Sequence, residues 1–314
     1  MNTPLLHLKR APAGIGRRLG ATWLCALFLG PAAHPLRADV TNLIAVADTT
    51  LQEAFPNNNL GSGPTILAGG RGQGGSTRGL LRFELDGNLP AGATVNSATL
   101  TLTVTATPFG GGNSTFDLHR VLGGWGEGGG SDRGGGTLAQ VGEASWNERL
   151  SPDTAWSTPG GDFAAAASAT QGVAGDGAYS FTSAALAADV QSWCNQPASN
   201  FGWLLRSEAE TTPATIRRFA SRTDISHPPV LTINYTAPVS PLPPTIFGVA
   251  LAENQIRFAF IAQSNRPYAV EFRDAITNGN WNVLTNIPAQ SANWMVQTTN
   301  TVSSAERYFR IRTP

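Results

Sequence analysis

Arginine and tryptophan are the side chains with the clearest chemical use in this sequence. Arg71, Arg78 and Arg82 stand close together in the chain, and Trp125 follows in a glycine-rich stretch. A guanidinium group can hold a carboxylate through two parallel hydrogen bonds, and an exposed indole ring can stack on the apolar face of a ring-shaped ligand. These four residues are therefore the candidates for a site that binds acidic sugars.

The same residue types also fit structural roles. Arg82 projects from the polar face of a predicted strand, where a solvated or cross-strand paired arginine is common. Trp146 and Trp156 also offer aromatic faces, although tryptophans in such positions more often pack in a core or anchor a loop. The glycine-rich residues 123–136 lack the Lys-Ser/Thr ending of a phosphate-binding loop, and we predict a flexible surface loop there.

Metal binding and catalysis have weaker signals. Asp48, Asp162 and Asp176 stand beside turns and are the candidate ligands of a structural calcium ion, although loop aspartates often bond their own backbone instead. His119 and His227 lack partners at metal-ligand spacing. No nucleophile–base motif or poised carboxylate pair is recognisable. We therefore predict no catalytic residues, a protein that is not an enzyme, and no cofactor apart from that calcium ion.

Short strands must position these side chains. Residues 98–105 alternate strictly, with Ala98, Leu100, Leu102 and Val104 on one face and four threonines on the other. Residues 81–85 and 231–235 alternate in the same way, and residues 202–206 indicate a more fully buried strand. One helix is predicted after Ser183, from Leu186, Val190 and Trp193 at helical spacing.

The ends of the chain differ in composition from the middle. Residues 1–38 carry five basic residues and no acidic one around a short apolar run, the layout of a secretory signal peptide cleaved near Ala38. The run is too short for a membrane span. Cleavage leaves 16 basic against 21 acidic residues, so we expect no nucleic-acid partner. Residues 237–244 hold four prolines and predict a stiff linker before a second alternating region, residues 245–314.

Several stretches resemble, in order, the DNRLRE domain family. They are Ala47–Leu51, Pro56–Gly61, Arg78–Leu85, Leu89–Thr103, Ser145–Asn147, Thr158–Phe163, Val190–Trp193, Asn200–Trp203 and Phe219–Arg222. The resemblance implies a jelly-roll module similar to carbohydrate-binding modules, and some members bind acidic polysaccharide such as alginate. Residues 268–271 and 307–312, with Trp281 and Leu284, resemble more weakly the fibronectin-like modules of secreted bacterial proteins.

The expected protein is all-β. A jelly-roll-like β-sandwich with one short helix spans residues 39–236, and a small fibronectin- or immunoglobulin-like sandwich spans residues 245–314. We expect a secreted, extracellular, non-catalytic protein that binds polysaccharide. The alternative is a structural or adhesive envelope or matrix protein without a sugar ligand.

Overall fold

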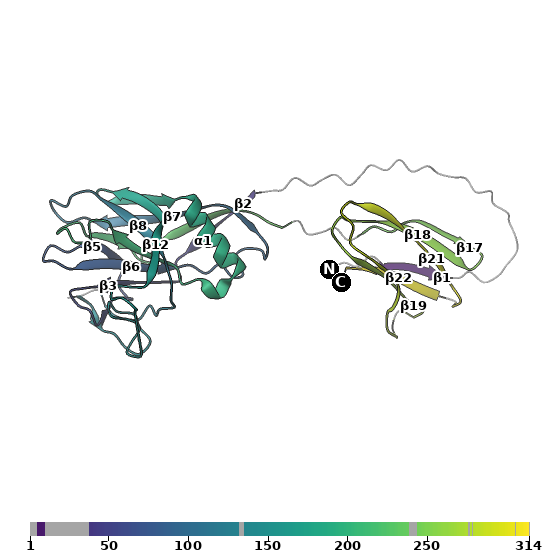
Figure 1. Ribbon diagram of the computed structural model, residues 1–314, viewed down its shortest axis with the longest axis horizontal. Helices are drawn as coiled ribbons and strands as arrows, with labels where there is room; N and C mark the ends of the chain where they lie inside the picture. Colours follow the sequence, from purple (N-terminus) through teal and green to yellow (C-terminus); the bar gives the residue numbers. More distant parts are fainter. Residues whose placement is uncertain are drawn as a thin grey trace. The chain divides into compact units, whose positions relative to one another are not determined.

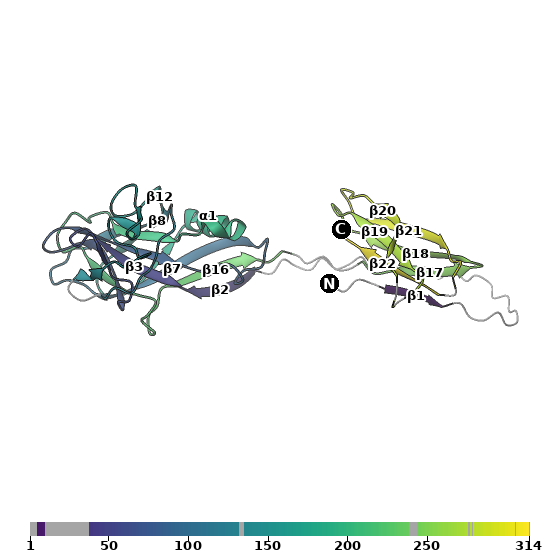
Figure 2. The same ribbon diagram turned by 90° about the horizontal axis from the view of Figure 1, so that it is seen from below.

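The computed structural model describes residues 5–9, 38–131, 135–238, 244–275, 277, 279–304 and 306–313. They form two compact units (Figures 1 and 2): a larger one within residues 33–239, and a smaller one that combines residues 5–9 with those after 240. The predicted all-β class with a single α-helix is confirmed for the described residues. Most of the predicted linker, residues 239–243, and of the predicted signal peptide, residues 1–4 and 10–37, lies outside the described residues.

Five antiparallel strands form one sheet of the larger unit, which we name sheet I. Their order is β3 (Ala47–Gln52), β6 (Ser76–Arg82), β14 (Trp203–Ser207), β8 (Ser114–Val121) and β12 (Phe163–Val173). Strands far apart in the sequence are neighbours here, so the side chains of one face come from five distant segments.

The opposing sheet, sheet II, is built on the long strand β7 (Thr94–Ala106). One edge of β7 pairs with β13 (Gly177–Thr182), and the other pairs with β16 (Val230–Thr236) and β15 (Arg217–Ala220). Outside these lie β2 (Ala38–Ile44) on β16 and β5 (Thr65–Gly70) on β15. β5 also pairs with β6 through Gly69 and Gly70, which joins both sheets into one curled sheet.

The main core lies between the two sheets. Leu81, Phe83 and Trp203 face it from sheet I, while Leu100 and Phe219 face it from sheet II. Burying one such side chain stabilises the fold by about 1.5–3 kcal/mol. The alternation of residues 98–105 therefore predicts the buried face correctly.

The helix α1 (Ala184–Asn195) closes the core at one end. The Ser183 side chain accepts a hydrogen bond from the Leu186 N–H, which confirms the predicted N-cap. Leu186, Val190 and Trp193 are the buried residues of α1, and the Trp193 ring lies 4.5 Å from the ring of Trp203. The short 3₁₀ helix η2 (Pro197–Ser199) follows.

Residues 122–131 and 135–162, which we name the loop layer, connect β8 to β12 and pack on the outer face of sheet I. They contain the short strands β9 (Thr137–Leu138), β10 (Glu148–Leu150) and β11 (Thr154–Ala155), and β9 pairs with β4 (Asn58–Asn59). Trp125, Trp146 and Trp156 form a second apolar cluster with Leu80 and Leu204 of the sheet. Both faces of this part of sheet I are therefore buried.

The smaller unit is a second pair of sheets. β17 (Phe247–Ala252), β18 (Gln255–Ala262) and β21 (Trp294–Thr301) form one, and β1 (Leu5–Lys9), β22 (Glu306–Arg312), β19 (Tyr268–Arg273) and β20 (Asn282–Ile287) form the other. Ile256, Phe258 and Phe260 face the core as the alternation predicts. Strand β1 comes from the region predicted as signal peptide and pairs with β22.

Candidate functional site

The outer face of sheet I carries two of the four predicted binding residues. Arg78 and Arg82 alternate on β6 with the core-facing Gly79 and Leu81, so both project outward. Register places Arg206 of β14 next to Arg78, because the preceding Leu205 pairs with Gly79. Arg206 in turn pairs with Asp117 of β8. A row of charged groups thus crosses three strands.

Arg78 is enclosed, which corrects its predicted role as a ligand-binding arginine. Its Nε and Nη2 donate to the two carboxylate oxygens of Glu210 at 3.0 and 2.8 Å, and its Nη1 donates to the Gly160 carbonyl at 2.8 Å. The guanidinium carbon lies 5.0 Å from the Trp146 ring centre and 5.4 Å from that of Phe163. With 14% of its side chain exposed, Arg78 fastens the loop layer to the sheet.

Trp125 is buried, so the prediction that its ring is open for stacking is wrong. Only 4% of the residue is exposed, and its indole Nε1 donates to the Phe201 carbonyl at 2.8 Å. Arg82 lies over its ring at 5.7 Å. The physical reason is the neighbouring glycine: a Cβ on Gly126 would lie 1.8 Å from the Gly142 carbonyl oxygen, so only glycine lets these backbones pack so closely.

Asn59 organises the glycine-rich segment, which corrects the prediction of a flexible loop for residues 123–131. The Asn59 amide donates to the carbonyls of Glu127 and Ala144 at 2.7 and 2.8 Å. Its oxygen accepts from the N–H groups of Gly61 and Gly130, both at 2.9 Å. The side chain is fully buried, and the three bonds to Glu127, Ala144 and Gly130 fix the loop layer on β4. Residues 132–134 of the segment lie outside the described residues.

Arg71 lies elsewhere, in the hairpin between β5 and β6. Its Nη1 donates to the Gln52 side-chain oxygen, and its guanidinium lies 5.2 Å from the Phe55 ring centre. The structure therefore does not gather Arg71, Arg78, Arg82 and Trp125 into one ligand site. It divides them among three separate packing contacts.

The three candidate calcium ligands also do not converge. Asp162 accepts from the N–H groups of Ser157 and Thr158, and Asp176 accepts from the Thr107 hydroxyl. Asp48 lies in a different cluster. Among the described residues, no group of three or more histidine, cysteine, aspartate or glutamate side chains is placed to hold a metal ion.

Asp48 is buried and belongs to a cluster with the partly exposed Glu127 and Arg222. Arg222 donates from Nε and Nη2 to both oxygens of Glu127, and its backbone N–H donates to Asp48 at 2.6 Å. Burial, aided by the charge of Glu127, raises the pKa of Asp48 from 3.8 to about 7, against the lowering effect of the Arg222 N–H. The hydrogen bonds to Glu127 raise the pKa of Arg222. This cluster ties the loop layer to β3 and to the turn after β15.

The row of charged groups reaches the solvent at Arg206. Its Nη2 lies 3.3 Å from Glu210, a longer contact than those of Arg78, and 27% of the side chain is exposed. Next to it, Asp117 accepts from the Thr170 hydroxyl at 2.9 Å. Sequence reasoning missed Arg206, although its position after Leu204 and Leu205 in a buried strand marks the point where that strand becomes polar.

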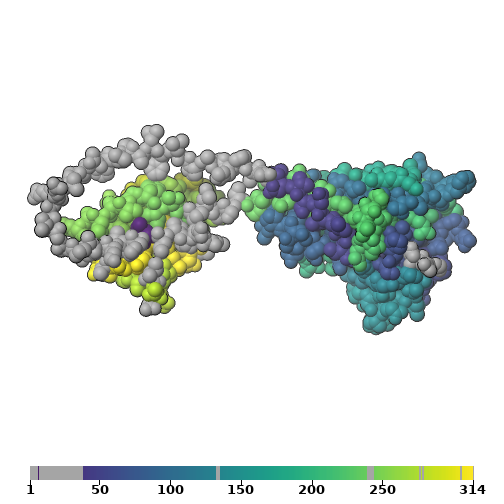
Figure 3. Space-filling view, turned by 180° about the vertical axis from the view of Figure 1, so that it is seen from behind, coloured from purple at the N-terminus to yellow at the C-terminus, as the bar shows by residue number. Residues whose placement is uncertain are grey.

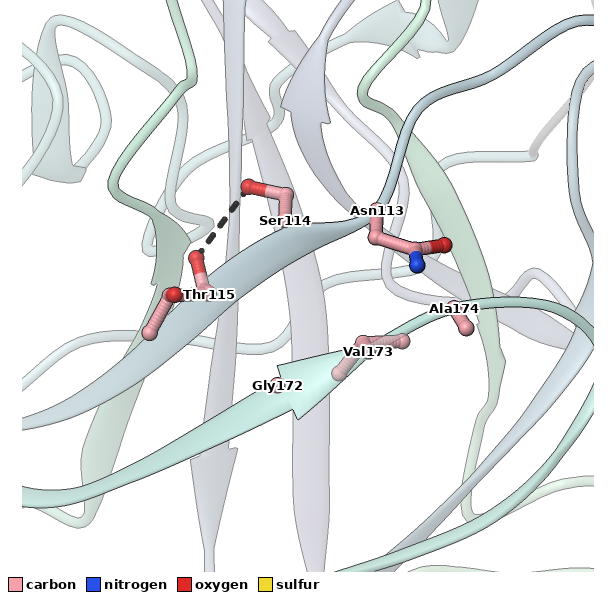
Figure 4. A pocket seen from close by; sticks show the side chains of 6 residues that line it. All are labelled: Asn113, Ser114, Thr115, Gly172, Val173 and Ala174. Atoms are coloured by element: carbon pink, nitrogen blue, oxygen red, sulfur yellow. Dashed lines mark hydrogen bonds between the residues drawn. The ribbon is translucent and has the colours of Figure 1, made fainter.

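An open depression continues this row between β8 and β12. It has a volume of about 310 Å³ and is lined by Asn113, Ser114, Thr115, Gly172, Val173 and Ala174 (Figure 4). Thr115 pairs with Gly172. This pair is the next one on the outer face of the two strands after the pair of Asp117 and Thr170. We name Asn113, Thr115, Asp117, Thr170 and Arg206 the polar strip. The strip thus presents hydroxyl and amide groups and one guanidinium group, while the Asp117 carboxylate is engaged by Thr170.

No protein-family model matches this sequence, and no curated protein matches it either. Within the described residues, no helix has the length and apolar character that crossing a membrane requires.

Proposed function

We propose that this protein is secreted and binds extracellular polysaccharide without catalysis, and that its larger unit recognises acidic chains along the polar strip. The observation that carries the proposal is Arg206, a partly exposed guanidinium group at the margin of the loop layer. On the same face, Asp117 of β8 stands between it and the Thr170 hydroxyl of β12, and the open depression lies further along β8 and β12.

The geometry of Glu210 supports Arg206 as the ligand-binding arginine. Arg78 already bonds both Glu210 oxygens at 2.8 and 3.0 Å, while Arg206 lies 3.3 Å from one of them. A sugar carboxylate can therefore pair with Arg206 at little cost to the Glu210 contacts. An exposed pair of this kind contributes about 1 kcal/mol or less, so binding is weak and depends on several such contacts along a polymer.

Binding is favoured over hydrolysis because the carboxylates beside Arg206 are already engaged. Asp117 accepts from the Thr170 hydroxyl at 2.9 Å, and both oxygens of Glu210 accept from Arg78. Glycoside hydrolysis needs two carboxyl groups that flank a sugar bond in an accessible cleft.

Affinity electrophoresis of the purified protein in gels that contain polyuronate or a neutral glucan tests the proposal. Arg206→Ala should weaken retardation by polyuronate about three- to fivefold and leave the weak effect of the glucan unchanged. Arg218→Ala is the matched control, since Arg218 is exposed on β15 of sheet II. Equal retardation of the wild type and Arg206→Ala by polyuronate would show that the polar strip does not bind this polymer. Retardation by neither polymer would favour the structural or adhesive function.

A further inference from the structure

A second group of arginines lies on the outer face of the smaller unit. Core residues Val270, Phe309 and Ile311 alternate with Glu271 and Arg273 on β19 and with Arg310 and Arg312 on β22. The register pairs Glu271 with Arg310, so these groups lie on neighbouring strands of one face. Trp281 immediately precedes β20, the next strand of the sheet.

Trp281 lies between two of these arginines. The guanidinium carbon of Arg273 is 4.5 Å from its ring centre, and that of Arg310 is 4.3 Å away. Stacking of this kind orients both guanidinium planes against the ring. The edges of the guanidinium groups, which carry the N–H donors, are then held in fixed directions.

The charges on this face do not balance. Glu271 accepts from Arg310 Nε at 2.6 Å and from Arg312 Nε at 3.1 Å, and only 5% of the Glu271 side chain is exposed. Glu306, on the same face of β22, accepts from the Tyr308 hydroxyl at 3.0 Å, so three guanidinium groups share this face with two carboxylates. Arg310 and Arg312 keep 29% and 49% of their side chains exposed, and the buried Nε of Arg273 has no hydrogen-bond partner among the described residues.

The neighbouring ion pair does not change this balance. Arg307 donates from Nε and Nη2 to both oxygens of Asp274, at 2.6 and 2.9 Å, so that pair is neutral. The excess positive charge therefore belongs to Arg273, Arg310 and Arg312, next to a partly exposed indole ring. We name Arg273, Trp281, Arg310 and Arg312 the arginine–tryptophan face.

We propose that the arginine–tryptophan face is a second binding site for carboxylated polysaccharide. The free guanidinium edges pair with carboxylates, and the margin of the Trp281 ring contacts the sugar. The excess of guanidinium groups on this face suits the carboxylates of a polyuronate. This inference shares its ligand class with the proposed function, but the site lies on the other unit and needs no residue of the polar strip.

Two sites on one chain have a measurable consequence. When a polymer is long enough to reach both sites, the second contact raises the apparent affinity without new interactions at the first. A short oligosaccharide can occupy only one site. Loss of the arginine–tryptophan face should therefore weaken binding of long polyuronate far more than binding of a short one.

The test compares four forms of the purified protein: wild type, Arg206→Ala, the double variant Arg273→Gln/Arg312→Gln, and all three changes together. Arg310 is kept because it holds the buried Glu271. The arginine control is Arg257→Gln, exposed on β18 of the opposite sheet. We expect about a tenfold loss of affinity for long polyuronate in the double variant, no loss in Arg257→Gln, and an unchanged melting temperature in both.

Other outcomes separate the two proposals. If only Arg206→Ala weakens binding, the arginine–tryptophan face is not a site and the polar strip stands. If only the double variant weakens binding, the face is a site and the polar strip is not. If the wild type does not bind polyuronate, both proposals fail. Equal loss of affinity for a DNA duplex and for polyuronate in the double variant would overturn the assignment to polysaccharide.

Discussion

Arginine stacks on tryptophan in both units of this protein, but with opposite consequences. In the larger unit, Arg78 stacks on Trp146 of the loop layer and bonds a buried carboxylate and a backbone carbonyl. In the smaller unit, Arg310 stacks on Trp281 and keeps part of its side chain exposed. The same pair of residue types anchors a loop to the sheet in the larger unit and stays partly exposed to solvent in the smaller unit.

The difference follows from the length of chain available to cover the sheet. Residues 122–162 separate β8 from β12 and include the loop layer that buries the outer face of sheet I. In the smaller unit, only residues 302–305 separate β21 from β22. A side chain on the outer face of a strand thus becomes core or surface according to a connection that is distant in sequence. Figure 3 shows one side of the surface of each unit.

The largest expected effect on stability comes from Asn59, whose hydrogen bonds join β4 to the loop layer. Asn59→Ala should lower the free energy of unfolding by about 4 kcal/mol, because two carbonyls and two N–H groups lose their partners in a buried site. Urea unfolding followed by tryptophan fluorescence measures this. Asn96→Ala, which removes an exposed amide on sheet II, should change the stability by less than about 0.5 kcal/mol. Similar losses of stability in Asn59→Ala and Asn96→Ala would contradict this role of Asn59.

The next effect compares the two arginine environments directly. Arg78→Ala should cost about 3 kcal/mol, because it leaves the carboxylate of Glu210 buried with only the longer Arg206 contact. Arg312→Ala should cost less than about 1 kcal/mol, since that pair is half-exposed. Thermal unfolding that resolves the two units measures both. A larger loss in Arg312→Ala than in Arg78→Ala would reverse the comparison.

A smaller effect depends on pH. The folded state keeps the proton of Asp48 up to about pH 7, whereas the unfolded chain releases it near the ordinary value of 3.8. The folded state therefore binds more protons in this range, and the contribution of Asp48 to stability falls as the pH rises from about 4 to about 7.

Asp48→Asn should remove that decline, because an amide oxygen still accepts from the Arg222 N–H and carries no charge. We expect the stability difference between Asp48→Asn and wild type to shift in favour of the variant by about 2 kcal/mol between pH 5 and pH 8. Chemical denaturation at both pH values measures it. A difference that stays constant with pH would show that Asp48 is ionised throughout.

The strands and cores follow from local patterns, whereas the candidate site does not. Alternation at residues 98–105 and helical spacing after Ser183 identify the buried faces, because each depends on neighbouring residues alone. The partner of Arg78 is 132 residues away, and the burial of Trp125 depends on close contact between two glycine-containing segments. Sequence spacing cannot show such pairings, since strand register decides them. The pattern of buried residues could have identified Arg206 as a polar position, because it stands near the end of a buried strand.

The central claim is that exposed arginines bind a carboxylated polymer. Calorimetric titration of the purified protein with polyuronate, at about 0.05 M and 0.5 M salt, tests it most directly, because exposed charges are screened beyond about 10 Å at 0.1 M salt. We predict binding at low salt that weakens severalfold at high salt, with a neutral glucan giving little heat at either. Binding that does not change with salt, or no binding of polyuronate at millimolar concentration, would contradict the account.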